Sequence, residues 1–175
     1  MEELILVKTS AKYAEQISEY RREFLDAGDS MDGCGSLGRM ENPFDFIKKC
    51  KDNESPDTLP EGLVLATQFM LVRKSDDKVV GMIQIRHYFN DYLAKFGGHI
   101  GYSVRPSERR RGYAKEMLKM ALPFCREIGL DKVLITCIDG NIGSEKTILA
   151  NGGVYEYTVY EPNENKNLKR FWITL

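Results

Sequence analysis

The chain of 175 residues lacks a long hydrophobic run, and its N-terminal segment, residues 1–7, lacks the features of a secretory signal. That segment is acidic and has an apolar run of only four residues. No apolar stretch approaches the roughly 20 residues that a membrane-spanning helix needs. These absences predict a soluble cytoplasmic protein with no membrane partner.

Cysteine is scarce and is not arranged for metal binding. The four cysteines, Cys34, Cys50, Cys125 and Cys137, contain no C-x-x-C pair, and the two histidines lie near none of them in sequence. We therefore expect no zinc site. Cys125 and Cys137 lie among apolar residues, which predicts buried free thiols and a reducing compartment.

Neither sign of charge is in large excess. The chain has 25 Lys and Arg against 26 Asp and Glu, a net charge of −1. A chain with that balance is a poor general binder of nucleic acid. Hydrophobic residues make up 42% and charged residues 29%, which is typical of a globular protein. The length favours a single domain over residues 1–175.

The spacing of apolar residues predicts an α/β (α+β) fold with a mixed sheet. Helices are expected to follow Thr9 or Ser10, Asn42 and Gly112, and a short one to span residues 144–150. Turn residues at 74–77 predict a hairpin between two of the strands. The strands are expected at residues 4–8, 63–73, 78–88, 99–104, 132–138, 154–160 and 168–174.

The segment from Tyr102 to Ala114 is the most informative. It runs from a strand through a basic loop with a single glycine, Gly112, into the start of a helix. The first amides of a helix have no intrahelical acceptor, and the helix dipole adds positive potential there. This arrangement predicts a diphosphate site, while the alternative is a solvated loop that happens to be rich in arginine.

The same residues resemble a known family. Arg109-x-x-Gly112-x-Ala114 is similar to the signature of the GCN5-related N-acetyltransferases (GNAT), and Asn141-x-x-Ser144 stands where that family often has Asn-x-x-Ala. The resemblance implies a GNAT-like, mostly antiparallel mixed sheet with helices on both faces. It also implies that two parallel strands, residues 99–104 and 133–138, splay apart.

The resemblance further implies acetyl-CoA as the co-substrate. Amides from Arg110 to Ala114 would hold the pyrophosphate, and the backbone of Tyr102 and Val104 would pair with the pantetheine arm like an added strand. An amide near Val104 would stabilise the oxyanion. The residues implied for cofactor binding are Tyr102, Ser103, Val104, Arg109, Arg110, Arg111, Gly112, Tyr113, Ala114, Asn141 and Ser144.

The chain departs from the family at its usual acid and base. Many relatives have a tyrosine seven residues after that asparagine, where this chain has Ile148. Some relatives carry a glutamate base where this chain has Gly98, beside His99. His99 is therefore the candidate base, and Tyr155, or Tyr157 on the same predicted strand, is the candidate acid. For each, the alternative is a structural residue of a strand.

The resemblance predicts direct acetyl transfer to a primary amine of a small molecule or peptide. The alternative is a non-catalytic acyl-CoA sensor or interaction module, and nucleic-acid binding is a third reading. The loop 28–38 with Asp26, Asp29 and Asp32 either borders the acceptor site and favours a cationic amine, or is a plain disordered loop. A homodimer is left open.

Overall fold

The computed structural model describes residues 2–175, and within them the order of elements follows the predicted one. The helices are α1 (Ala14–Ala27), α2 (Pro43–Asp52), α3 (Tyr113–Glu127) and α4 (Ile142–Ala150). The strands are β1 (Leu4–Lys8), β2 (Ala66–Arg73), β3 (Lys78–Arg86), β4 (Ile100–Val104), β5 (Lys132–Ile138), β6 (Val154–Glu161) and β7 (Lys166–Thr174).

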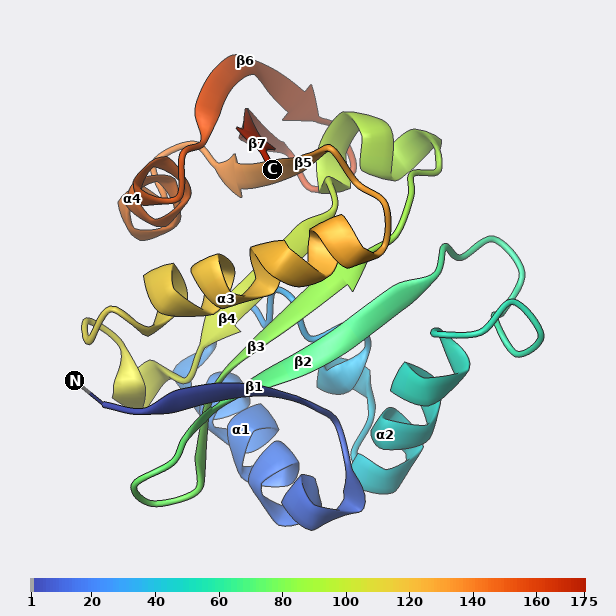
Figure 1. Cartoon of the computed structure of the whole chain (residues 1–175), viewed down its shortest axis with the longest axis vertical. Coiled ribbons are helices and arrows are strands. Elements are labelled where there is room, and N and C mark those ends of the chain that lie inside the picture. The colour runs from blue at the N-terminus through green and yellow to red at the C-terminus, as the bar shows by residue number, and fades with distance from the viewer. Residues whose placement is uncertain (1) are drawn as a thin grey trace.

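The strands form two sheets that lie on either side of α3 in Figure 1. The first has the order β1-β2-β3-β4 and the second the order β5-β7-β6, and the pairs within both are antiparallel. The predicted hairpin joins β2 to β3. The predicted fold class is confirmed, but β2 begins at Ala66 and β3 ends at Arg86, and beyond this pairing the Leu65 carbonyl accepts from the His87 amide.

Helices cover both faces of the first sheet, as predicted. On one face α1 and α2 bury Ile17, Tyr20, Phe24 and Phe46 against β2 and β3. On the other face α3 packs against β3, β4 and β5 through an apolar side that includes Met117, Leu118, Ala121 and Cys125. Each helix presents apolar residues at three- and four-residue steps, which is why one face can be buried continuously.

The loop of residues 28–38 is packed against the sheet, so the alternative of a plain disordered loop is wrong. Cys34 and Leu37 are buried. A Cβ built on Gly33 would lie 2.2 Å from the carbonyl oxygen of Gly101, so only glycine lets the loop approach β4 this closely. The loop is therefore a fixed wall beside β4.

A buried ionic cluster lies where β4 leads into α3. Glu108 is 4% exposed and forms ion pairs with Arg73 at 2.8 Å and with Lys78 at 2.6 Å. Arg73 also donates to Asp76 and to the Tyr113 hydroxyl. The hydrogen bond from Arg73, aided by the charge of Lys78, lowers the pKa of Glu108 to about 2. The cluster ties the turn after β4 to the β2–β3 hairpin.

Within residues 2–175, no helix is both long and apolar enough to cross a membrane.

Glu108→Gln should lower the free energy of unfolding by about 1.5–3 kcal/mol at neutral pH, because it removes charged hydrogen bonds from a buried cluster. The lowered pKa means that this contribution is complete above the unfolded pKa of about 4.3 and is lost as the pH falls toward 2. Urea unfolding from pH 7 to pH 2.5 should show the two proteins converging. Glu3→Gln, at an exposed pair with Lys74, is the control and should change stability little. A difference in unfolding free energy that stays constant across this pH range would contradict the lowered pKa of Glu108.

Candidate active site

A cavity of about 680 Å³ opens between β4, β5, the start of α3 and α4. It exists because β4 and β5 meet at only one end. There the His99 amide donates to the Leu134 carbonyl at 2.8 Å, and the Leu134 amide donates to Nδ1 of His99 at 2.9 Å. Among residues 2–175 no further backbone hydrogen bond joins the two strands. The separation of this strand pair is confirmed.

The edge of β4 that faces the gap carries unpaired backbone groups. The backbone amide of Arg86 donates to the His99 carbonyl, and the backbone amide of Arg105 donates to the Val80 carbonyl. Alternate residues from His99 to Arg105 therefore bond to β3. Tyr102 and Val104, which lie between them, therefore turn their backbone groups toward the cavity that both residues line. The Val104 carbonyl accepts from Nε of Arg109 at 3.1 Å.

The turn into α3 presents a run of amides without acceptors. Gly112 occupies the N-cap position with φ of 83°, and Arg110 also has a positive φ of 65°. Among residues 2–175, no atom accepts a hydrogen bond from the backbone amides of residues 110–114. Arg110, Gly112, Tyr113 and Ala114 line the cavity. The turn thus combines free N–H groups with the positive end of the α3 dipole.

The three consecutive arginines have different surroundings. Arg109 pairs with Asp29 at 2.6 Å, and Arg111 pairs with Glu108 at 3.4 Å and does not line the cavity. Arg110 lines the cavity and forms no ion pair with any residue in 2–175. Of these three arginines, Arg110 is therefore the one whose charge is available to a bound anion.

Side chains of β4 and α4 meet across the cavity. The Tyr102 hydroxyl lies 2.8 Å from Oγ of Ser144, and burial raises its pKa well above the ordinary value. Asn141 Oδ1 accepts from the Ser144 amide at 3.1 Å and so caps α4. Ser103 lines the cavity, yet its hydroxyl lies on the other face, 3.0 Å from that of Tyr20.

The structure does not bring His99, the candidate base, into the wall of the cavity. Its ring is 5% exposed, stacks on Phe89 at 3.9 Å between centroids, and uses Nδ1 to accept from Leu134. Burial lowers its pKa to about 4, with the charge of Arg86 adding to the effect. His99 does not line the cavity. It is a neutral structural residue at the junction of the strands.

Tyr155 is also placed away from the cavity. It lies on β6, the outer strand of the second sheet, where it is 52% exposed. Its ring packs on Phe171 and its hydroxyl lies 2.9 Å from that of Thr158. The order β5-β7-β6 puts a whole strand between Tyr155 and β5, so the structure does not bring this candidate acid into the wall of the cavity.

Several lining residues were missed from the sequence. Arg86, Tyr92 and Phe96 line the end of the cavity nearest the junction of β4 and β5. The sequence signal for Arg86 was the alternation Met82-Gln84-Arg86, which puts two polar side chains on one face of the predicted strand. Cys137 lines the cavity too, and burial raises the pKa of its thiol to about 11, so it is protonated at neutral pH.

The geometry agrees with a comparison against protein families. A family model described as acetyltransferase (GNAT) family matches residues 39–150, which is more than half of the chain. The chain belongs to the GNAT acetyltransferase family. Its members are acetyl-CoA-dependent transferases, so this GNAT protein is an enzyme of that class. No curated protein matches the sequence closely enough to count as a relative.

Solved structures share the fold of this GNAT protein at low identity. The ribosomal-protein-S5-alanine acetyltransferase from Vibrio fischeri is 15% identical, with a TM-score of 0.70 over 99% of this chain and 94% of that one. RimJ from Mycobacterium smegmatis, in complex with CoA-disulfide, is 18% identical with a TM-score of 0.71 over 98% and 81%. The microcin C7 self-immunity acetyltransferase MccE, in complex with acetyl-CoA and AMP, is 16% identical with a TM-score of 0.71 over 100% and 94%.

His99→Leu should destabilise this GNAT protein by about 1–3 kcal/mol, because the buried Leu134 amide loses its acceptor. His99→Asn, which can offer an oxygen to that amide, should lose less. Since the pKa of His99 is lowered from 6.5 to about 4, its contribution to stability is complete above pH 6.5 and is lost as the pH falls through 4. Chemical denaturation at pH 7.5 and pH 4.5 checks both points. If His99→Leu kept its stability but lost its turnover, His99 would instead have a catalytic role.

Proposed function

We propose that this chain is an N-acetyltransferase that moves the acetyl group of acetyl-CoA to a primary amine of a small molecule or peptide by direct attack. The observation that carries the proposal is the turn before α3, where the amides of residues 110–114 have no acceptor among residues 2–175 and border a cavity of about 680 Å³. A cavity of this size suits an extended carrier molecule.

The pyrophosphate of the carrier would bind at this turn. Free amides and the α3 dipole attract phosphate oxygens, and Arg110 adds an unpaired positive charge. Glu108 and Asp29 neutralise the neighbouring Arg111 and Arg109, so these two arginines shape the turn instead of binding anions directly.

The pantetheine arm would extend along the open edge of β4. Tyr102 and Val104 direct backbone groups into the gap, as an edge strand does before another strand is added. This path leads the thioester toward Ile100, Phe96 and Arg86, where β4 and β5 converge. Asn141 supports the path indirectly, because its side chain caps α4 and positions Ser144.

In the reaction, the amine nitrogen would attack the thioester carbon, forming a C–N bond as the C–S bond breaks. The departing sulfur needs a proton and the amine must lose one. Tyr102 is our candidate donor: its hydroxyl contacts Ser144, one helical turn before the buried Ile148, and its raised pKa keeps it protonated. Neither His87 nor His99 lines the cavity, whereas Asp29, Asp32 and Glu164 do, so the amine proton would pass to water or to one of these carboxylates.

Membership of a family of acetyl-CoA-dependent transferases disfavours the alternative of a non-catalytic acyl-CoA sensor, and Ile148 in place of the usual tyrosine is the residue that speaks for it. A homodimer, a cytoplasmic location, and the absence of nucleic-acid and membrane partners stay predictions. The four cysteines are free and buried, which supports a reducing compartment.

Acetyl-CoA should bind the purified protein in calorimetry, and a thiol-release assay with a broad amine panel should show turnover. Arg110→Gln should weaken binding of CoA by about five- to tenfold, since one charge-assisted contact to phosphate is lost. Arg111→Gln is the matched control and should weaken it less, because Arg111 pairs with Glu108 outside the cavity. Pantetheine, which lacks the phosphates, should bind both variants equally.

Absence of acetyl-CoA binding would refute the proposal. Binding without turnover on any amine would favour the sensor. Equal losses of CoA affinity in the two arginine variants would refute the assignment of Arg110.

Tyr102→Phe should reduce kcat by about a hundredfold, the lower range for loss of a general acid, with a much smaller change in the KM for acetyl-CoA. Tyr155→Phe removes an equivalent hydroxyl outside the cavity and should leave both constants unchanged. Steady-state thiol release measures these effects. A Tyr102→Phe enzyme with undiminished kcat would show that the sulfur takes its proton from another group.

A further inference from the structure

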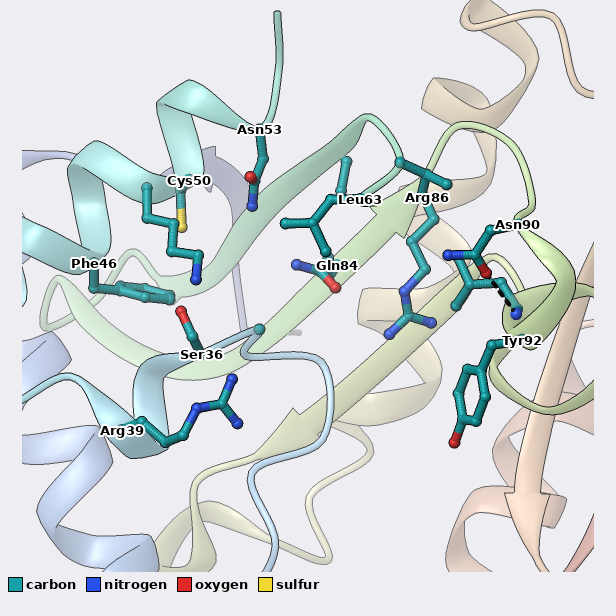
Figure 2. A pocket seen from close by; sticks show the side chains of 15 residues that line it. Ser36, Arg39, Phe46, Cys50, Asn53, Leu63, Gln84, Arg86, Asn90 and Tyr92 are labelled. Atoms are coloured by element: carbon teal, nitrogen blue, oxygen red, sulfur yellow. Dashed lines mark hydrogen bonds between the residues drawn. The ribbon is translucent and has the colours of Figure 1, made fainter. Parts of the chain in front are cut away.

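A second cavity of about 310 Å³ lies beside the first and is shown in Figure 2. The loop before α2 forms one wall, and α2 forms another through Phe46 and Cys50. The end of β3 and residues 90–93 complete it. It lies on the face of the first sheet that α1 and α2 cover.

The lining of this second cavity is basic. It includes Arg39, Lys49 and Arg86, and among residues 2–175 no Asp or Glu lines it. None of the three bases forms an ion pair within the described chain. Figure 2 shows the guanidinium groups of Arg39 and Arg86 directed into the cavity from opposite sides, with Gln84 between them. The cavity therefore has a positive potential that no residue of its wall neutralises.

Arg86 is the most informative of these residues because it differs from the buried arginines of this chain in its partners. Arg73, Arg105 and Arg170 are each less than 10% exposed, and each meets a carboxylate. Such pairing is the rule for buried charges. Arg86 is partly buried, and it has no such partner among residues 2–175.

The position of Arg86 is fixed by the backbone. Its Nη1 donates to the carbonyls of Gly97 at 3.1 Å and Gly98 at 3.3 Å, while no atom in residues 2–175 accepts from its Nε or Nη2. Desolvation lowers the pKa of Arg86, and the charges of Tyr92 and Asp32 offset this only in part. Asp32 acts on Arg86 through space only, without a hydrogen bond or ion pair.

The two cavities share part of their walls. Arg86, Tyr92 and Leu93 line both of them. The shared wall lies at the end of the first cavity where the thioester is expected. Asp32, the carboxylate whose charge acts on Arg86, lines the first cavity only. A molecule that spans the shared wall would meet positive charge on one side and negative charge on the other.

We propose that the second cavity binds the acid group of the acceptor, so that the acceptor class is small amines bearing a carboxylate or phosphate. Arg86, Arg39 and Lys49 hold that anion, and the amine points past Tyr92 toward Asp32 and the thioester. This inference rests on the proposed function. It differs from the expectation that the aspartates of loop 28–38 select a purely cationic amine.

Matched acceptors test the class. β-Alanine is compared with propylamine, and phosphoethanolamine with ethanolamine, in the thiol-release assay. The member of a pair that bears the acid should have a kcat/KM about ten- to a hundredfold higher, since a charged hydrogen bond to Arg86 is gained. The two pairs distinguish carboxylate from phosphate.

Variants test the residues. Arg86→Gln and, separately, Arg39→Gln should remove most of that preference by raising the KM for the acidic amine, with little change for its neutral partner. Lys48→Gln is the control, because Lys48 is exposed on α2, pairs with Asp52 and does not line the cavity. Arg39 is exposed, so its variant remains informative if Arg86→Gln folds poorly.

A binding measurement avoids dependence on turnover. Inorganic phosphate at millimolar concentration is added to protein already saturated with CoA, so that the turn before α3 is occupied. Wild type and Lys48→Gln should gain thermal stability, and Arg39→Gln should gain less. No gain in wild type, or an equal gain in Arg39→Gln, would overturn the assignment.

The outcomes separate the two proposals. If acetyl-CoA binds and neutral or polycationic amines are acetylated as well as acidic ones, the acceptor class is wrong while the transferase proposal stands. If acetyl-CoA does not bind, the transferase proposal fails whatever phosphate does.

Discussion

The active-site cavity depends on the contact between His99 and Leu134. The neutral imidazole accepts the Leu134 amide, and the His99 amide donates to the Leu134 carbonyl, so the two sheets are joined at that point. Because the Leu134 amide donates to the His99 side chain, it does not donate to a backbone carbonyl of β4, and β4 and β5 diverge beyond this contact. The gap leaves the edge of β4 free, and the α3 turn opens onto the same gap.

The other end of the cavity is shaped by charge pairing. Glu108 draws Arg73, Lys78 and Arg111 into one cluster, and Asp29 holds Arg109. These pairs fix the turn while leaving the amides of residues 110–114 without partners. Because an anion gains most from donors that are already in position, the ionic cluster would contribute to the proposed binding of phosphate without touching it.

Features that depend on neighbouring residues could be predicted from the sequence, whereas contacts between segments that are distant in the sequence could not. The strand, basic turn and helix around Gly112 follow from neighbouring residues, which is why this unit was predicted correctly. The packing of Gly33 on Gly101 joins distant segments, so the fixed loop was missed. The position of Tyr155 depends on the order β5-β7-β6, and the burial of His99 depends on Phe89 and Leu134. Residue type and strand membership do not determine which cavity a side chain lines.

The unpaired guanidinium of Arg86 connects the two ends of the site. It is anchored on the carbonyls of Gly97 and Gly98, and the next residue is His99, which joins the two sheets. An anion bound at Arg86 would therefore be held by the same short segment that sets where β4 and β5 diverge. In the proposed reaction that point would limit how deep the thioester enters, so recognition of the acceptor and placement of the acetyl group would both rest on this segment of backbone.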